Sequence, residues 1–422
     1  MVNEEISLEK MKGNLYDPLF PYDWKEASLY SLARWINGLA FRDFQFSVKG
    51  LPVIKIAEIK GGLSSQTKFT EQSFDESVRI KPGDLLFSWS GQPETSIDAF
   101  RWCGIAGWLN QHIFRVIPKE GINQTFLFYL LKYLKPNFIG IARNKQTTGL
   151  GHVTKRDLEN IKIAYPSFAV QCKIAYILGA LDDKIEVNRQ INETLDMMVC
   201  NLFKDWFIDF GPVRAKMQGL EPYLQDDLWQ AFPEHLDDKG KPAGWEIQHV
   251  SKFLSLMYGK SLPARNRRIG DVPVYGSGGI TGVHDKALIT EQAIIVGRKG
   301  TVGSLYWESR PCFPIDTVFY VKPKLPLAFC YYLLSNLPLR AMNTDAAVPG
   351  LNRENVYRLE FSTPSPKLVS SFTKIADKIR ERMNACARES EILSQIRDAL
   401  LPKLMSGEIQ IQDAERIIGD QA

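Results

Sequence analysis

The sequence lacks the features of a membrane protein and of a disulfide-stabilised or zinc-binding protein. Apolar runs such as Phe126–Leu131 are far shorter than the roughly 20 residues that span a bilayer. The six cysteines stand singly at 103, 172, 200, 312, 330 and 386, without a Cys-x-x-Cys spacing. The first residues, Met1–Glu5, are acidic and show no secretory signal pattern. We therefore expect a cytoplasmic protein that binds no membrane and no structural metal.

Motifs that support catalysis are also missing. Asp17-Pro18-Leu19-Phe20 lacks the second proline of a base-methylating tetrapeptide, and Gly276–Gly282 lacks the strand-to-helix context of a nucleotide loop, so we predict a surface loop there. Asp43 with Glu58 and Lys60 could form a metal-nuclease triad, but position 58 corresponds to a glycine in the second half of the chain. The five histidines are dispersed. We expect no catalytic residues and no metal ligands.

The length and the charge pattern point to two folded units with basic surfaces. The chain has 422 residues, 45% of them hydrophobic, and a net charge of +4. Such a length exceeds what one core usually organises. Between Asp98 and Asp157 one acid stands against nine bases, and the window 247–270 has no acid and five bases. Basic segments of this kind favour a polyanionic partner, although a single one arises readily by chance.

Self-comparison shows that the chain contains an internal repeat. Residues 153–167 align with 351–365 at an offset of 198, and the same register continues for more than forty residues. Upstream the offset grows in steps to 205, 209 and 221, which places Trp24 over Trp245. The order of the matching segments is conserved throughout, so we infer a duplication of the whole unit.

Each repeat ends in a long segment with a heptad stripe of apolar residues. In the first, Ile174, Leu181, Asn188, Leu195 and Leu202 are seven residues apart, and Ile177, Ile191 and Met198 lie between them. The second has Phe372, Ile379, Cys386, Leu393 and Leu400, with Ile375 and Ile396 between them. Neither stripe can be buried alone, so we predict an antiparallel coiled coil. Asn188 either sets its register or faces water.

The predicted fold class is therefore α+β (mixed), with two pseudo-twofold-related globular domains separated by two long antiparallel coiled-coil helices. Short strands are expected near 52–54, 84–89 and 293–297, and short apolar helices near 126–134 and 327–337. The expected boundaries are 1–165 for the first domain, 166–210 for the first helix, 211–243 for a connector, 244–365 for the second domain, 366–410 for the second helix and 411–422 for a tail.

Three motifs carry a resemblance to a known family. Leu109–Val116, Leu178–Asn188 and Leu202–Phe210 resemble segments of the specificity subunits of Type I restriction-modification enzymes, and Arg397–Ile409 is similar to that family's distal conserved helix. The resemblance implies two target-recognition domains, each of which reads one half of a bipartite asymmetric DNA site, and helices that set the gap between the halves. A related restriction-modification system, or a stand-alone bipartite DNA-binding regulator, remains an alternative.

The same resemblance implies the partners and their cofactors. A subunit of this family is non-catalytic and binds double-stranded DNA, two methyltransferase (modification) subunits and a restriction/translocase subunit. S-adenosylmethionine, ATP and Mg²⁺ would be bound by those partners and none by this chain. The recognised bases, the gap length, the methylated base and the oligomeric state of the isolated chain cannot be predicted from the sequence.

Charge and turn chemistry give the candidate DNA-binding residues, because base edges are read by polar side chains and phosphates are bound by lysine and arginine. In the first repeat they are Lys60, Gln66, Lys68, Arg143, Asn144 and Lys145, and in the second Arg265, Arg267, Arg268, Ser277, Arg298 and Lys299. Phe203, Trp206 and Phe207 are candidates for partner binding, with core packing as the equal alternative.

Overall fold

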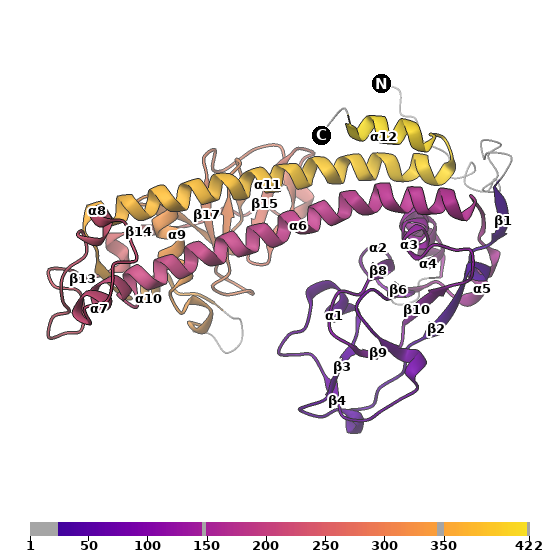
Figure 1. Ribbon diagram of the computed structural model, residues 1–422, viewed down its shortest axis with the longest axis horizontal. Helices are drawn as coiled ribbons and strands as arrows, with labels where there is room; N and C mark the ends of the chain where they lie inside the picture. Colours follow the sequence, from indigo (N-terminus) through magenta and orange to yellow (C-terminus); the bar gives the residue numbers. More distant parts are fainter. Residues whose placement is uncertain (1–23, 146–148, 344–349, 420–422) are drawn as a thin grey trace. The chain divides into compact units, whose positions relative to one another are not determined.

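The helices and strands of the computed structural model occur twice in the same order (Figure 1). The structure describes residues 24–145, 149–343 and 350–419, so the predicted segments 1–23 and 420–422 lie outside the described residues. The chain divides into two compact units, Met1–Glu186 with Ser390–Ala422, and Val187–Glu389. Each long helix therefore contributes one part to each unit.

The central sheet of the first unit has four antiparallel strands in the order β2, β10, β6, β8. Their bounds are Ala33–Asn37, Ile113–Pro118, Leu85–Ser88 and Asp98–Arg101. Helices α3 (Gln124–Tyr133) and α4 (Lys135–Asn144) cover this sheet, and the rings of Phe87 and Phe138 meet at 4.9 Å. The Asn123 side chain accepts a hydrogen bond from the Phe126 amide, which caps the start of α3.

The central sheet of the second unit repeats this topology, with the order β14, β20, β17, β18. Its strands are Leu254–Tyr258, Val318–Pro323, Ala293–Gly297 and Leu305–Glu308, and α9 (Leu327–Ser335) takes the place of α3. The predicted strands and apolar helices of both repeats are confirmed. The predicted surface loop at Gly276–Gly282 is wrong, because these residues form the turn of a β-hairpin between β15 (Val272–Gly276) and β16 (Gly279–His284).

Two further strand pairings occur once in each unit. β1 (Lys25–Ser28) pairs with β12 (Lys162–Tyr165), and β13 (Glu246–His249) pairs with β21 (Glu360–Thr363). A parallel pair joins β3 (Leu51–Ile54) to β9 (Gly107–Leu109), and its equivalent joins β15 to β19 (Phe313–Pro314). A parallel pair is unusual among antiparallel strands, so finding it twice confirms the duplication.

The remaining elements are short. The strands are β4 (Phe69–Thr70), β5 (Arg79–Ile80), β7 (Ser90–Gly91) and β11 (Gly151–His152). The helices are α1 (Ile56–Gly61), α2 (Pro93–Ser96), α5 (Lys155–Asn160), α7 (Gly211–Met217), α8 (Asp226–Trp229), α10 (Arg353–Tyr357) and α12 (Ile411–Gly419). Among the described residues, no helix is both long enough and apolar enough to cross a membrane.

The two long helices are α6 (Phe168–Phe207) and α11 (Pro366–Ser406), and they pack against each other as predicted (Figure 1). They are antiparallel, since Asp182 meets Arg397 in the first unit and Asp196 meets Arg380 in the second. Gly407 ends α11 in the left-handed conformation (φ 76°) that glycine adopts without strain.

The seam of α6 follows the predicted heptad with one correction. Ile174, Leu181 and Asn188 are buried, but Met198 is 56% exposed. The interleaved row that faces the core includes Leu178 and Val199 instead, four residues after each main position. Asn188 sets the register rather than facing water, because its side-chain amide donates to the carboxylate of Glu389 on α11 at 2.8 Å.

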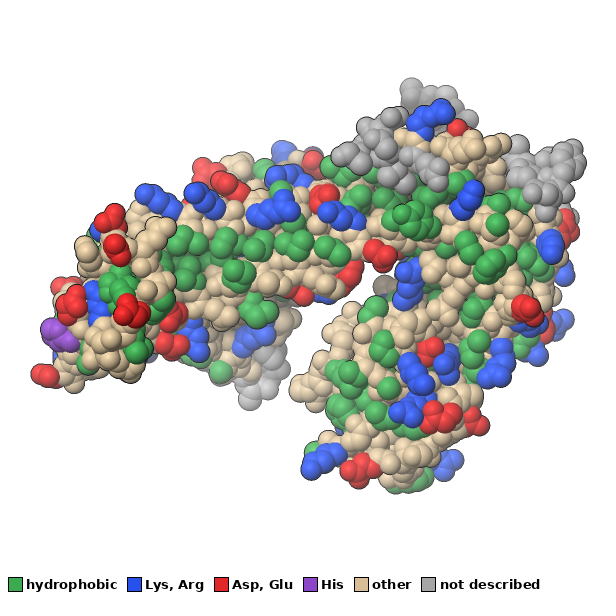
Figure 2. All heavy atoms as spheres, viewed as in Figure 1, with side chains coloured by type: hydrophobic (Ala, Val, Ile, Leu, Met, Phe, Trp, Pro, Cys, Tyr) green, Lys and Arg blue, Asp and Glu red, His purple; other side chains and the backbone are tan. Residues whose placement is uncertain are grey.

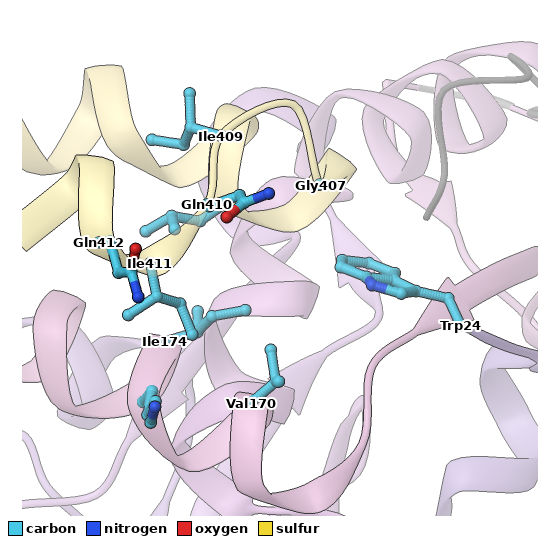
Figure 3. Close-up of a pocket in the computed structure, with 10 residues that line it drawn as sticks. Trp24, Val170, Ile174, Gly407, Ile409, Gln410, Ile411 and Gln412 are labelled. Carbon is cyan, nitrogen blue, oxygen red and sulfur yellow. The ribbon is translucent and has the colours of Figure 1, made fainter. Parts of the chain in front are cut away.

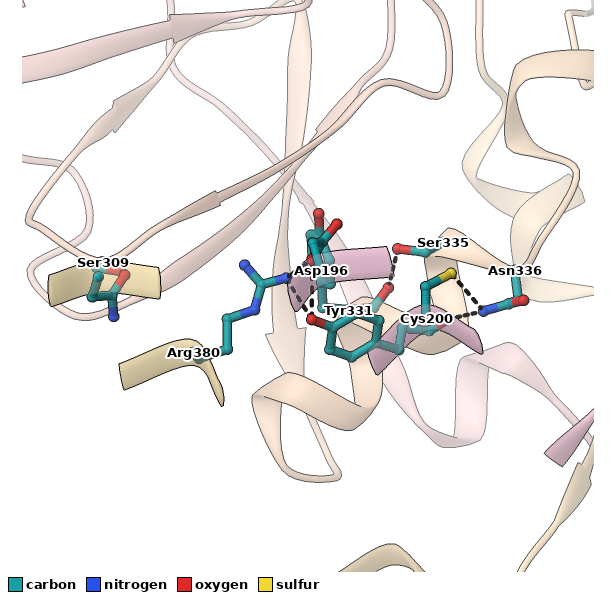
Figure 4. Close-up of polar contacts among 9 residues, drawn as sticks. Asp196, Cys200, Ser309, Tyr331, Ser335, Asn336 and Arg380 are labelled. Atoms are coloured by element: carbon teal, nitrogen blue, oxygen red, sulfur yellow. Dashed lines mark hydrogen bonds and ion pairs between the residues drawn. The ribbon is translucent and has the colours of Figure 1, made fainter. Parts of the chain in front are cut away.

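The second unit is fastened to its part of the helix pair by a buried arginine (Figure 4). Arg380 of α11 donates to Asp196 of α6 at 2.7 Å and to the hydroxyl of Tyr332 of α9 at 3.0 Å. Its guanidinium also lies over the rings of Trp307 and Tyr331, 4.6 and 4.4 Å from their centroids. One cation thus joins both long helices to the recognition sheet.

The first unit has a related cluster in which the charges are exchanged. The Tyr129 hydroxyl of α3 donates to Asp182 of α6 at 2.6 Å, and Arg397 of α11 donates to the same carboxylate at 2.6 Å. The repeat offset of 198 places Asp182 at the position of Arg380. Each unit therefore holds a tyrosine, an aspartate and an arginine at the helix pair, with opposite charges at the equivalent position.

The predicted connector 211–243 is part of the second unit's core. Val213 of α7 and Phe232 are buried, and the Phe232 ring meets Trp206 of α6 edge-on at 5.5 Å. Lys216 donates to the Phe232 carbonyl and to Glu234, which fixes the turn after α7. The chain between the two repeats is therefore folded against the end of α6.

Candidate nucleic-acid interface

Lys60, Gln66 and Lys68 lie on α1 and on the following segment, at the surface of the first unit. The Lys60 ammonium group donates to the Thr95 carbonyl, whereas Gln66 and Lys68 are exposed. Glu58 holds this segment in place, because its buried carboxylate accepts from the Lys55 amide at 3.0 Å and from the Thr67 hydroxyl at 3.2 Å. Glu58 thus has a structural task, and the described residues contain no cluster of three or more His, Cys, Asp or Glu suited to a metal ion.

Arg143, Asn144 and Lys145 lie at the end of α4, where all three are exposed. Arg143 pairs with Glu94 at 2.6 Å, and Lys145 pairs with Asp157 at 2.5 Å. These ion pairs link α4 to α2 and α5. The two cations would have to share or exchange these carboxylates to bind phosphate.

The basic segment 98–157 is largely neutralised in the folded unit, because acids from elsewhere in the unit meet its cations. Lys132 and Lys135 both pair with Asp98, and Arg115 pairs with Asp84. Of the nine bases, Lys119 and Arg156 are exposed and have no ion pair within the described part of the chain. The charge count of the sequence therefore overestimates the positive surface of this unit.

Asp98 gives a test of this neutralisation through pH. Burial alone would raise the pKa of Asp98, but Lys132 and Lys135 outweigh burial and hold the pKa below its ordinary value. A carboxyl with a depressed pKa stabilises the fold above its unfolded pKa of about 3.9 and loses this effect as the pH falls through the folded value. We expect Asp98→Asn to lower the free energy of unfolding by about 1 kcal/mol at pH 7.

The measurement is denaturant unfolding of the wild type and the variant between pH 7 and pH 3. The difference between the two proteins should shrink as the pH falls below about 4. Glu120→Gln, which changes an exposed acid in the same unit, is the control and should change little at any pH. A difference for Asp98→Asn that stays constant over this range would contradict the assignment.

The candidates of the second unit lie in three places. Arg265, Arg267 and Arg268 are in the segment between β14 and β15, Ser277 is in the turn between β15 and β16, and Arg298 and Lys299 follow β17. Arg267 donates to the Thr281 carbonyl at 2.7 Å, and Arg268 pairs with Asp285 at 3.0 Å. Arg265 is exposed and has no ion pair among the described residues.

Ser277 and Arg298 are partly occupied within the fold. The Ser277 carbonyl accepts hydrogen bonds from Ser304 and Tyr306. The Arg298 guanidinium donates to the Asp316 carbonyl at 2.6 Å and lies 5.2 Å from the centroid of the Tyr258 ring. Lys299, next to it, is exposed.

The position of Arg298 has an equivalent in the first unit that sequence reasoning missed. Trp89 lies 209 residues earlier; its indole nitrogen donates to Asn37 at 2.9 Å, and its ring meets His112 at 5.0 Å. His152 also meets Trp89 and shares a hydrogen bond of 2.9 Å with Ser90. Burial and the nearby His152 lower the pKa of His112. The repeat register pairs Trp89 with Arg298, and following it would have found this cluster.

The same place in the two units thus carries different chemistry. The first has aromatic and imidazole rings, and the second has a guanidinium over tyrosine. Over the face drawn in Figure 2, basic and acidic side chains are interspersed, and no large area of one charge forms. Such surfaces suit recognition by individual side chains better than a uniform attraction for polyanions.

The structure favours core packing over partner binding for Phe203, Trp206 and Phe207. All three are buried, and Phe203 and Phe207 meet the Phe372 ring at 5.3 and 5.6 Å. They are therefore corrected here to core residues of the second unit. In this unit the exposed apolar residues of α6 are Val187, Met197 and Met198, which lie on its outward face.

A separate pocket of about 440 Å³ lies in the first unit, beside the first turns of α6 and the end of α11 (Figure 3). Val170, Ile174, Leu404, Ile409 and Ile411 give it an apolar lining, and Lys173 is the one charged side chain among its described lining residues. It has no pair of titratable groups that could support acid–base chemistry.

Known proteins share this sequence over most of its length. The family model "Type I restriction modification DNA specificity domain" matches residues 21–197. The Type I restriction enzyme HindI specificity subunit of Haemophilus influenzae is 27% identical over 472 residues, which cover 92% of this chain and 100% of that protein. The chain belongs to the family of Type I restriction-modification specificity subunits.

Two other members of the comparison are similar to a lesser degree. The Type I restriction enzyme MjaIX specificity subunit of Methanocaldococcus jannaschii is 26% identical over 424 residues and covers 85% of this chain and 92% of that protein. The crystal structure of an S subunit from M. genitalium has 17% identity and a TM-score of 0.49, covering 93% of this chain and 98% of that one. The specificity-domain match ends within α6, so it contains the first recognition sheet and part of a long helix.

Proposed function

We propose that this chain is the sequence-specific DNA-recognition subunit of a Type I restriction-modification complex. Each recognition unit would read one half of a bipartite, asymmetric site, and α6 with α11 would set the gap between the halves. The duplicated fold on a shared antiparallel helix pair carries this proposal. The different side chains at Trp89 and Arg298 support two different half-sites.

The proposed partners are double-stranded DNA, two methyltransferase subunits and a restriction/translocase subunit, acting in the cytoplasm. S-adenosylmethionine, ATP and Mg²⁺ would be bound by these partners, and the chain itself would be non-catalytic. The methyltransferase subunits would dock on the outward face of α6, where Val187, Met197 and Met198 are exposed. Methionine adapts its shape to an apolar partner, which suits such a face.

Genome-wide methylation mapping tests the proposal. A strain that expresses this chain with its neighbouring methyltransferase should carry one methylated bipartite motif, and deletion of this chain alone should abolish that methylation. Persistence of the same methylated motif after the deletion would refute the proposed role. Tight binding of a defined site by the isolated chain, without complex formation, would support the alternative of a stand-alone regulator.

Arg265 provides a more local prediction. Arg265→Gln removes an exposed cation that has no ion pair among the described residues, so the assembled complex should bind its site about three- to tenfold more weakly, with a shallower salt dependence. Fluorescence anisotropy at several salt concentrations would measure both effects. Arg382→Gln, which changes an exposed arginine of α11, is the control; equal losses in the two variants would argue against a specific role for Arg265.

A further inference from the structure

One segment of each recognition unit presents an apolar side chain to solvent at the same place in the repeat. The segments are 38–50 and 259–271, which connect β2 to β3 and β14 to β15. Each contains one short 3₁₀ helix, η3 (Asp43–Gln45) or η6 (Ala264–Asn266), and these helices are 221 residues apart, like the flanking strands. The two segments are therefore true equivalents.

Val48 and Ile269 are the exposed residues, and they too are 221 residues apart. Their exposed fractions are 94% and 101%, the largest among the exposed large hydrophobic residues that the structure describes. Single exposed apolar residues are common on protein surfaces. Two that occupy the same position in strongly diverged repeats call for a shared explanation.

Both side chains are held outward by anchored backbone on either side. In the first unit the Ser47 amide donates to the Phe69 carbonyl at 2.9 Å, and Gly50 lies so close to Thr70 that a Cβ would approach its carbonyl oxygen to 2.2 Å. In the second unit the Arg268 amide donates to His284 at 3.1 Å, and a Cβ on Gly270 would lie 2.4 Å from the His284 carbonyl. The close approach of these segments to the neighbouring strand fixes the position of each side chain.

Cationic residues accompany each aliphatic side chain. Arg42 and Lys49 lie in the first segment and are exposed, and Arg265 and Arg268 are exposed in the second. Valine and isoleucine are branched at Cβ and have few rotamers, so ordering them against a partner costs little entropy. A rigid aliphatic group between cations suits a polyanion that also offers an apolar group.

We propose that Val48 and Ile269 each contact the 5-methyl group of a thymine in the major groove, one in each half-site. The thymine methyl is the apolar group among the base edges in that groove, and the adjacent cations would bind the flanking phosphates. This inference rests on the proposed function and adds to it a required feature of the target. Each half-site must contain at least one A·T pair.

Replacement of thymine by uracil tests the contact, because it removes the methyl group and leaves the hydrogen-bonding edges unchanged. The probe is a duplex with the site found by methylation mapping, and the protein is the full chain assembled with its methyltransferase subunits. One uracil in each half-site should weaken wild-type binding about three- to fivefold, the value of one methyl group removed from water. Ile269→Ala should bind the thymine duplex at least that much more weakly and should no longer distinguish uracil at its position.

Val48→Ala should behave in the same way at the other half-site. The controls are Ile105→Ala in the first unit and Ile247→Ala in the second, which shorten other exposed isoleucines and should keep the full sensitivity to uracil. Thermal unfolding of each variant confirms that it is folded.

Three results would overturn the inference while leaving the proposed function intact: wild-type binding that is insensitive to uracil at every position, alanine variants that keep the wild-type sensitivity, or a mapped half-site without an A·T pair. Failure of the wild-type complex to prefer the mapped duplex over an unrelated one would instead refute the proposed function.

Discussion

Arg380→Met is expected to lower the free energy of unfolding of the second unit by about 2 to 3 kcal/mol. Removal of one partner of a buried ion pair costs about 3 to 5 kcal/mol, and the partial exposure of Asp196 reduces that figure. Methionine retains much of the side-chain volume, so the loss reports the charge, its hydrogen bonds and its contacts with Trp307 and Tyr331.

Denaturant unfolding monitored by tryptophan fluorescence would measure this loss, because Trp307 lies beside the guanidinium. Arg382→Met is a matched control, since it makes the same substitution two residues away on an exposed face of α11 and should change stability by less than about 0.5 kcal/mol. Addition of Asp196→Leu to Arg380→Met should restore part of the stability, because it removes the carboxylate that the first change leaves unpaired. Similar small losses for Arg380→Met and Arg382→Met would contradict the role assigned to Arg380.

A seven-residue insertion in both long helices is expected to lengthen the non-specific gap of the methylated motif and to leave both half-sites unchanged. The insertion follows Glu186 in α6 and Glu389 in α11, at the division between the two units. Seven residues add about 10 Å of helix and preserve the heptad pattern, so Ile174 and Leu195 keep their places in the seam.

The matched control is the same insertion in α6 alone. It should abolish methylation or reduce the yield of the complex, because the antiparallel partner helix then has the wrong length for the contacts beyond the insertion. Methylation mapping of strains that carry each variant reads out both predictions. A doubly inserted protein that methylates the original motif with its original gap would show that the helices do not set the spacing.

The sequence predicted the architecture well because the repeat constrains it twice. The offsets between Val153–Ser167 and Leu351–Ser365, and between Trp24 and Trp245, already fixed which segments are equivalent, and the structure pairs their strands in the same order. The heptad stripe predicted the helix seam, apart from Met198. That error arose because an interleaved row lies either three or four residues from the main one, and the sequence alone favoured the wrong spacing.

The candidate site was predicted less well, because charge along a sequence does not show which cations are already paired. Arg143 and Lys145 meet carboxylates from other elements, and Arg298 binds a carbonyl of its own unit. Phe203, Trp206 and Phe207 resembled an exposed aromatic motif until the folded connector and Phe372 covered them. Val48 and Ile269 were missed because exposure of a single aliphatic residue leaves no pattern in the sequence.

The exchange of charge between the two tyrosine clusters determines which halves of the molecule can pair. If two first repeats met as the two repeats do here, Asp182 would face Val199, the counterpart of Arg397, with the acidic Asp196 one turn away. Two second repeats would bring Arg380 toward Arg397, a repulsion between like charges. Only unlike halves provide both opposite charges. Divergence after the duplication has thus made a gene fusion hard to reverse, since neither half can replace its sister.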